Sequence, residues 1–343
     1  MTISQYNRSK ITILNSVLIM MVLYIHSYYL EGEKYGFTLA LQRFIGASAF
    51  CGTANRLFFF LSGLLFFNGI TQIKDCLTKI RKRVRSLLIP YLIWNVVFVL
   101  WYVALNCIPG VKGFINSNIL GHFETTIWES LCFLWIAPAS FPLWFLRDLM
   151  VMVGLSPIIY LFIKYLKIYG IMFYMLLSLF LPNSGMFFIL GATVAMLSDL
   201  DRLEKWLNVP LVICCIVVFL GGCLFIAFQS KEYKVSTVLT FVMGITGMIA
   251  TWRGYDFIAG GKCLKKGSFW AGLMGYSFFI YLFHEPAFNI IKKIPIWLLG
   301  DSELTVTIFF LINPILMALV AIGVAKGLQK MVPNIYSVLV GGR

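Results

Sequence analysis

Residues 19–30, IMMVLYIHSYYL, end a membrane-length apolar run with a histidine, His26, among aromatic residues. An ionisable side chain near the end of such a run is energetically expensive and usually has a function. Asn15 precedes His26 by eleven residues, or three helical turns, and therefore lies on the same helix face about 16 Å away. The stretch predicts a transmembrane helix with a functional polar group near one end.

The composition extends this prediction to the whole chain. The hydrophobic fraction is 60%, charged residues are 12%, and the mean hydropathy is +0.88. Soluble domains are closer to half apolar and a quarter charged. We therefore expect an all-α, polytopic membrane protein that forms one domain over residues 1–343.

The net charge of +14 does not indicate a nucleic-acid partner. The Lys and Arg residues form short clusters between apolar runs, the densest at 74–85, and loops of this kind are typical of the cytoplasmic side of a membrane. The cysteines form no C-x-x-C pair, so we expect neither a zinc site nor a disulfide framework. The charge pattern predicts that both termini are cytoplasmic.

The apolar runs predict about ten transmembrane helices, although the short fifth and sixth could instead form one re-entrant hairpin. These two would meet at the turn 182–185, which has the sequence PNSG. The other predicted helices are 11–30, 55–73, 86–107, 142–166, 207–228, 235–252, 268–291 and 304–326.

Four of these helices bring ionisable or polar side chains to one depth, opposite the N-terminus. A histidine at this depth could simply face the headgroups, and an arginine could extend toward water. Adjacent helical positions diverge by about 100°, so neighbouring polar residues should find separate partners. Together these residues favour a functional cavity: His26, Arg56, Trp144, Arg147, Asp148, His284 and Glu285.

Five blocks in order carry a family resemblance: VLYIHS (22–27), LFFFLSGLLFF (57–67), RKRVRSLLIPY (81–91), PLWFLRDL (142–149) and YSFFIYLFHEP (276–286). With these blocks the chain resembles the integral-membrane acyltransferase 3 family, whose members modify bacterial surface polysaccharides. The resemblance implies an enzyme of the bacterial cytoplasmic membrane. It also implies acyl-CoA as co-substrate, usually acetyl-CoA and sometimes succinyl-CoA, with no bound cofactor, and a sugar hydroxyl of a polysaccharide or lipid-linked glycan as acceptor.

The resemblance also implies roles for individual residues. His26 matches the family's catalytic histidine, and His284 matches a histidine late in the family pattern. Asn15 stands where the family has a basic residue, which implies either that another basic group substitutes or that donor binding is weakened or altered. CoA is cytoplasmic, whereas the predicted site lies on the outer side. Either the pantetheine arm enters from the basic face that carries Arg81, Arg83 and Arg85, or the acyl group is passed across the membrane.

Acyl transfer from a thioester to an alcohol needs a base or an acyl carrier and a group that stabilises the oxyanion. We assign the first role to His26, because imidazole titrates near neutral pH. Either His284 or Glu285 would orient His26 or the acceptor, since adjacent side chains diverge.

The remaining polar residues are candidates for substrate binding. Arg56 and Arg147 would stabilise negative charge, and Asp148 would fix one of them. Trp144 and Asn15 complete the predicted substrate site. The alternative function is a transporter or flippase for a lipid-linked glycan, although the inverted repeats typical of many transporters are not evident.

Overall fold

The computed structural model describes residues 3–107, 135–177, 184–198, 200–229, 235–262 and 269–342. Within these ranges the regular structure is entirely helical, which confirms the predicted all-α class. Of the predicted turn 182–185, the first two residues lie outside the described residues, and the last two begin a helix, α9 (Ser184–Leu197).

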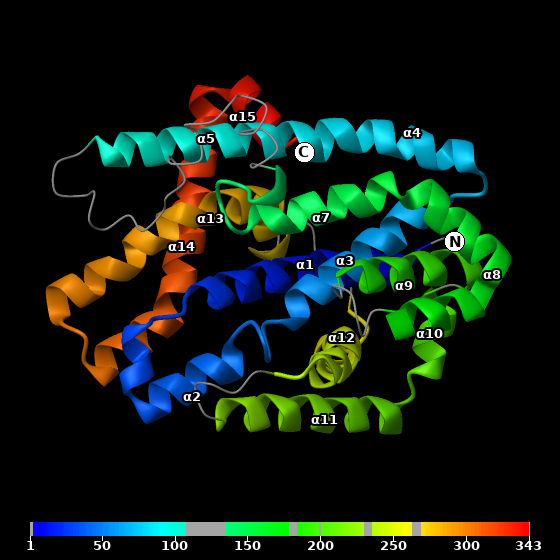
Figure 1. Ribbon diagram of the computed structural model, residues 1–343, viewed down its shortest axis with the longest axis horizontal. Coiled ribbons are helices and arrows are strands. Elements are labelled where there is room, and N and C mark those ends of the chain that lie inside the picture. The colour runs from blue at the N-terminus through cyan, green and yellow to red at the C-terminus, as the bar shows by residue number, and fades with distance from the viewer. Residues whose placement is uncertain are drawn as a thin grey trace.

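Helix α1 (Gln5–His26) runs through the middle of the molecule (Figure 1). Ser4 caps its first turn by accepting a hydrogen bond from the backbone N–H of Asn7. Leu18 and Leu23 are fully buried. His26 is the last helical residue, so the helix begins and ends earlier than the predicted 11–30.

Two groups of helices lie on opposite sides of α1 (Figure 1). On one side α4 (Ile73–Arg83) continues through a π-helical turn (Val84–Leu88) into α5 (Ile89–Asn106). On the other side lie α11 (Val209–Ala227) and α12 (Thr237–Ala259), which pack against each other. The basic segment 74–85, which the sequence placed in a loop, is therefore helical.

Shorter helices complete these two layers. The segment 31–43, which falls in the loop between the predicted helices 11–30 and 55–73, contains a 3-10 turn (Glu31–Lys34) and most of α2 (Gly36–Ile45). The others are α3 (Thr53–Phe67), α9 (Ser184–Leu197), α10 (Leu200–Trp206) and α15 (Pro333–Leu339).

Two long helical segments are broken. α7 (Leu143–Gly154) and α8 (Ser156–Leu177) meet at a bend of 57°, inside the predicted helix 142–166. α13 (Phe269–Leu299) is interrupted at Glu285, whose φ of −105° and ψ of 136° are extended. The next residue is proline, which disfavours the helical conformation at the position before it. α14 (Glu303–Met331) packs along both α13 and α1.

A buried ionic cluster fixes the beginning of α1. Lys10 is fully buried, and its ammonium lies 2.9 Å from carboxylate oxygens of both Glu204 on α10 and Asp256 on α12. The same ammonium lies 4.0 Å from the ring centroid of Trp252. Tyr6 donates a hydrogen bond to Asp256 at 2.6 Å. Because buried charges are stable only when paired, this cluster ties three helices together.

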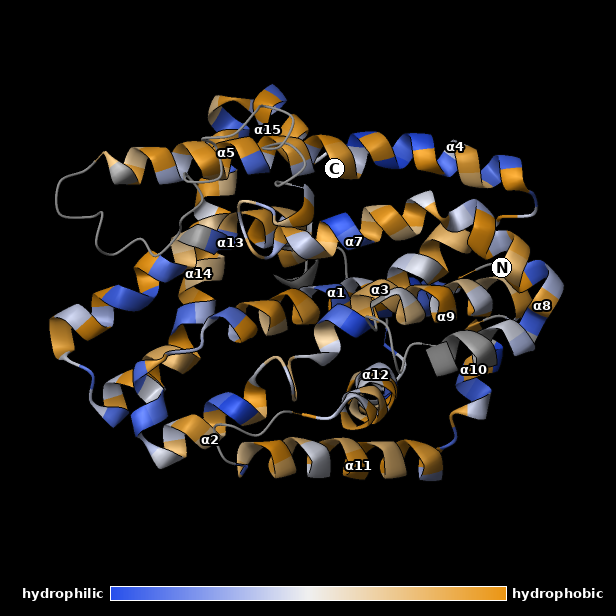
Figure 2. Cartoon of the chain, in the orientation of Figure 1, coloured by the Kyte–Doolittle hydropathy of each residue, from blue (hydrophilic) through white to orange (hydrophobic). Residues whose placement is uncertain are grey.

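The helix surfaces are those of a membrane protein. On α11 an exposed face repeats every three or four residues and is entirely apolar, through Ile213, Val217, Leu220 and Leu224. Figure 2 shows this helix as an almost continuous hydrophobic ribbon. Within the described ranges, four helices, or five if α7 and α8 form one bent span, are long and apolar enough to cross a membrane. The ten predicted crossings and the cytoplasmic termini are not confirmed.

Glycines allow α3 and α9 to approach each other at backbone distance. A Cβ atom on Gly63 would clash with the carbonyl of Phe188, and one on Gly191 would clash with the carbonyl of Phe60. Neither obstacle is the flexible end of a side chain. The two helices therefore pack in this way only with glycine at both positions.

We expect Gly63→Ala to lower the free energy of unfolding by about 2 kcal/mol, the range found for overpacked cores. Thermal unfolding of the detergent-purified protein measures the effect. Gly221→Ala on α11 is the matched control, because nothing lies within 4 Å of a Cβ atom there. The helix propensity of alanine should leave that variant as stable as the parent or slightly more so. Equal melting temperatures for the two variants would contradict the close packing.

Candidate active site

The end of α1 and the break in α13 bring two histidines and a carboxylate together. The ring centroids of His26 and His284 are 5.0 Å apart. Oε1 of Glu285 lies 3.7 Å from Nδ1 of His26, within ion-pair range but longer than a good hydrogen bond. The side chains of His26 and Glu285 are 16% and 13% exposed, so a small molecule can still reach them.

The structure corrects the expectation that only one of His284 and Glu285 reaches His26. On an unbroken helix adjacent side chains diverge by about 100°. The extended backbone at Glu285 removes that constraint, so the imidazole of His284 and the carboxylate of Glu285 both lie beside His26.

Backbone and side-chain partners fix the orientation of both α13 residues. Nδ1 of His284 lies 2.7 Å from the carbonyl oxygen of Tyr281, which can only accept a hydrogen bond, so Nδ1 carries the proton. Nε2 of His284 is buried and has no partner among the described residues. Asn289 donates to Oε2 of Glu285 at 2.7 Å. This leaves Oε1 of Glu285 free to face His26.

The segment before α7 forms a wall of this site. The ring of Phe141 lies edge-on to His26, with centroids 6.2 Å apart. The hydroxyl of Ser140 approaches the carbonyl of Glu285 at 3.5 Å, and Tyr281 donates to the carbonyl of Pro142 at 2.6 Å. Residues 140–142 therefore contact both His26 at the end of α1 and the segment 281–285 of α13.

Hydrogen bonds in both directions join the end of α1 to α13. The ammonium of Lys292 donates to the carbonyl of His26 at 2.9 Å and to that of Tyr28 at 3.3 Å. The hydroxyl of Tyr29 donates in return to the carbonyl of Lys292 at 3.1 Å. Ser27 fixes the same end to α14 by donating to the carbonyl of Phe310 at 2.8 Å.

A cavity of about 240 Å³, which we call the central cavity, runs along α1 toward this site. Asn15 and Ile19 line it from α1, and so does Val22, one turn before His26. Tyr281 lines it from α13, one turn before His284. Its walls are mainly apolar, and the few polar side chains are Asn15, Asn55, Ser62, Arg83, Ser277 and Tyr281.

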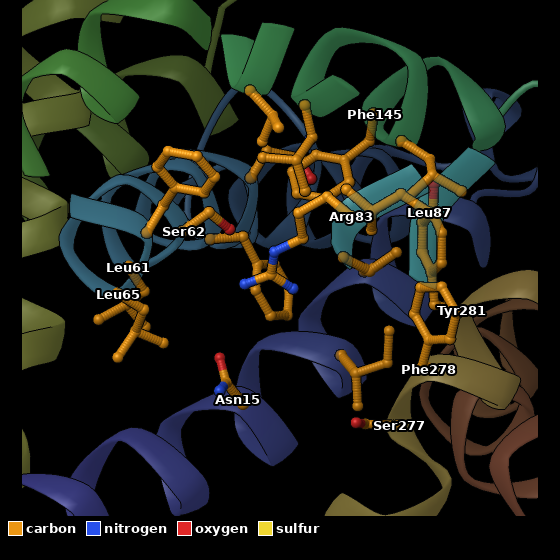
Figure 3. A pocket seen from close by; sticks show the side chains of 18 of the residues that line it. Asn15, Leu61, Ser62, Leu65, Arg83, Leu87, Phe145, Ser277, Phe278 and Tyr281 are labelled. Atoms are coloured by element: carbon orange, nitrogen blue, oxygen red, sulfur yellow. The ribbon is translucent and has the colours of Figure 1, made fainter. Parts of the chain in front are cut away.

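Arg83 is the member of the predicted donor-binding set that enters the central cavity. Its side chain extends into the space between Ser62 and Asn15 (Figure 3). Arg81 and Arg85 are exposed on α4 and the π-helical turn, because residues two apart on a helix point in nearly opposite directions. The described residues give Arg83 neither a hydrogen bond nor an ion pair. The cavity therefore contains an arginine beside Asn15, the position at which the family resemblance implies a basic residue.

The structure places Arg56 away from the histidines. Its neighbour Asn55 lines the central cavity, whereas the Arg56 side chain packs against Gly244 of α12. Its Nη1 atom is buried without a partner among the described residues. The predicted grouping of Arg56 with His26 has no contact to support it.

Arg147 and Asp148 pair with each other, which corrects the expectation of separate partners. Nε and Nη2 of Arg147 lie 2.9 Å and 2.8 Å from the same carboxylate oxygen of Asp148. Nη1 of Arg147 also donates to the carbonyl of Ile136. Trp144 is half-buried and packs edge-on against Phe145, which lines the central cavity. These residues support the wall around the site.

Four residues of this neighbourhood were not predicted from the sequence: Phe141, Tyr281, Asn289 and Lys292. Asn289 and Lys292 follow Glu285 at spacings of four and seven, which in an unbroken helix would place all three on one face. That periodicity was a usable signal. Phe141 and Tyr281 gave none, because aromatic residues abound in this chain. Among the described residues, no three His, Cys, Asp or Glu side chains converge closely enough to hold a metal ion.

Comparisons with known proteins match most of the chain to a protein family. Residues 9–325 match a protein family described as an acyltransferase domain. The succinoglycan biosynthesis protein ExoH of Rhizobium meliloti (strain 1021) is 23% identical over 359 residues, which cover 98% of this chain and 92% of that protein. No solved structure gives a significant match.

The difference in burial predicts different reactivity of the two histidines. Diethyl pyrocarbonate should modify His26 at least about 10-fold faster than His284, because His284 is fully buried and His26 is partly accessible. Peptide mass spectrometry of the purified protein at short reaction times measures both rates. Equal rates would contradict the burial of the His284 side chain.

Proposed function

The chain belongs to the acyltransferase domain family, and we propose that it is a membrane O-acyltransferase. It transfers an acyl group, acetyl or succinyl, from acyl-CoA to a hydroxyl of a cell-surface or lipid-linked polysaccharide. The observation that carries the proposal is the central cavity, which leads along α1 from Arg83 to within one turn of His26 and His284.

The lining of the central cavity suits a thioester on a long, flexible arm. Asn15 and His26 are separated by about 16 Å along α1. An arm of that reach would lie against the apolar walls with its polar groups beside Asn15 and Ser62. The exposed cations Arg81 and Arg85 would remain outside for the phosphates of CoA, and Arg83 would guide the arm inward.

His26 then acts as the general base. The acceptor hydroxyl gives its proton to Nε2 of His26 while its oxygen attacks the thioester carbonyl carbon. The resulting tetrahedral oxyanion collapses, the carbon–sulfur bond breaks, and the departing sulfur takes the proton from His26. The products are an ester on the glycan and free CoA. His26 ends the cycle neutral, so the reaction needs no other proton donor or acceptor.

Glu285 orients His26 for this role. A carboxylate beside Nδ1 favours the tautomer in which Nε2 is the free base, and it stabilises the imidazolium that forms during the reaction. The 3.7 Å separation leaves a small adjustment to occur when substrate binds. His284 presents an unprotonated Nε2 in the same neighbourhood and can accept a hydrogen bond from the acceptor.

The relative named for succinoglycan biosynthesis supports a polysaccharide acceptor. The apolar helices support a multi-pass protein of the bacterial cytoplasmic membrane. In that membrane α1 presents Lys10 toward the cytoplasm and His26 toward the outer side. The donor would thus enter from the cytoplasm, and the acceptor would approach the other end of the cavity.

His26→Ala should reduce acylation of the glycan by at least about 100-fold, the usual contribution of a general base. The measurement is mass spectrometry of surface glycan from a deletion strain that carries either the parent gene or the variant. Glycan quantity and protein quantity in the membrane serve as controls and should not change. A transporter would give the opposite result, with less exported glycan and unchanged acyl content.

Arg83→Gln should raise KM for acyl-CoA about 10-fold and leave kcat within about twofold, because uniform donor binding would be lost. Acyl transfer in membrane vesicles at several acyl-CoA concentrations measures both constants. Lys82→Gln is the matched control, since Lys82 is an exposed cation on the same helix to which no donor contact is assigned, and its loss should change KM by less than about threefold. A larger effect at Lys82 than at Arg83 would overturn the proposed path of the donor.

A further inference from the structure

The break in α13 creates a positioning problem. A continuous helix would fix Glu285 relative to the residues before it, but the extended backbone at Glu285 uncouples the second half of α13 from the first. The second half therefore takes its position from what it packs against. Its placement decides where the carboxylate of Glu285 lies relative to His26.

Lys292 makes the charged contact between this second half and α1. Its ammonium donates to the carbonyls of His26 and Tyr28 at the C-terminal end of α1. The last carbonyls of a helix lack intrahelical donors and carry partial negative charge, so a cation is favourable there. The ammonium also lies 5.6 Å from the ring centroid of Phe288, one turn earlier on the same helix.

The contact is reciprocal, because the hydroxyl of Tyr29 donates to the carbonyl of Lys292. Tyr29 is in turn fixed by the amide of Asn313 on α14 and by Gln42 on α2, which accepts from its backbone N–H at 2.6 Å. The end of α1 and the second half of α13 thus hold each other through Lys292, which donates to two carbonyls and accepts from Tyr29. Asn289 lies one turn before Lys292 and donates to Oε2 of Glu285, so the position of that carboxylate follows from the same contact.

We propose that Lys292 is a positioning residue. Its hydrogen bonds join the end of α1 to the second half of α13 and thereby hold the imidazole of His26 close to the carboxylate of Glu285. The catalytic consequence rests on the proposed acyltransferase function. The contact between Lys292 and the end of α1 does not depend on that function.

Lys292→Met tests the inference, because methionine keeps most of the side-chain volume and removes the donor and the charge. We expect kcat for acyl transfer in membrane vesicles to fall about 10-fold to 100-fold, since small displacements of catalytic groups have effects of this size. KM for acyl-CoA should stay within about twofold, because Lys292 does not line the central cavity. Lys292→Arg should recover at least part of kcat, since a guanidinium can donate to the same carbonyls.

Lys293→Met is the matched control, because it removes the same charge from the adjacent, exposed position. It should leave kcat within about twofold. Equal kcat losses in Lys292→Met and Lys293→Met, or an unchanged kcat in Lys292→Met, would overturn the inference. If Lys292→Met does not accumulate in the membrane, Lys292→Gln, which retains a neutral donor, replaces it with the same expected direction.

A second readout needs no catalytic activity. The ratio of His26 to His284 modification by diethyl pyrocarbonate should rise severalfold in Lys292→Met and stay constant in Lys293→Met. General unfolding would expose both histidines and lower that ratio. If the parent protein transfers no acyl group, the proposed function fails, but the modification ratio still tests whether Lys292 holds α1 against α13. An unchanged ratio in Lys292→Met overturns this positioning role and leaves the proposed function untouched.

Discussion

The candidate active site depends on the helix break at Glu285. The residue before a proline avoids the helical conformation, and here it adopts extended dihedral angles within α13. A straight helix would direct His284 and Glu285 to different neighbours. The break turns the carboxylate of Glu285 toward His26, which His284 already faces, and the hydroxyl of Ser140 approaches the carbonyl of Glu285 there. A local rule of proline stereochemistry thus has a direct consequence for the chemistry of the site.

The break matters because α1 is held firmly at both ends. At its beginning the buried ammonium of Lys10 bridges carboxylates on α10 and α12. At its end the carbonyl of His26 accepts from Lys292. Removal of one member of a buried ion pair costs about 3–5 kcal/mol, so the first anchor resists displacement of the helix along its axis. Between the two anchors the Asn15 face of α1 remains available to the central cavity.

Several features of the chain followed from local sequence alone. The apolar runs predicted helices, and the ends of the predicted 207–228 lie within two residues of α11. The quoted blocks around His26 and His284 predicted an acyltransferase, in agreement with the family match. Local patterns failed where a segment carried polar residues yet remained helical. α2 and the basic helix α4 were both placed in loops, because amphipathic helices resemble polar loops when burial is unknown.

The sequence by itself determined that this is a helical membrane acyltransferase, because hydropathy and ordered blocks are properties of local segments. Only the tertiary structure decided which polar residues share a site. It joined Glu285 and His284 to His26, turned Arg56 toward α12, and paired Arg147 with Asp148. It also placed Arg83 in the same cavity as Asn15, and the ammonium of Lys292 within hydrogen-bond distance of the carbonyl of His26. These partnerships depend on how each helix rotates against its neighbours, and no residue pattern within one helix specifies that rotation.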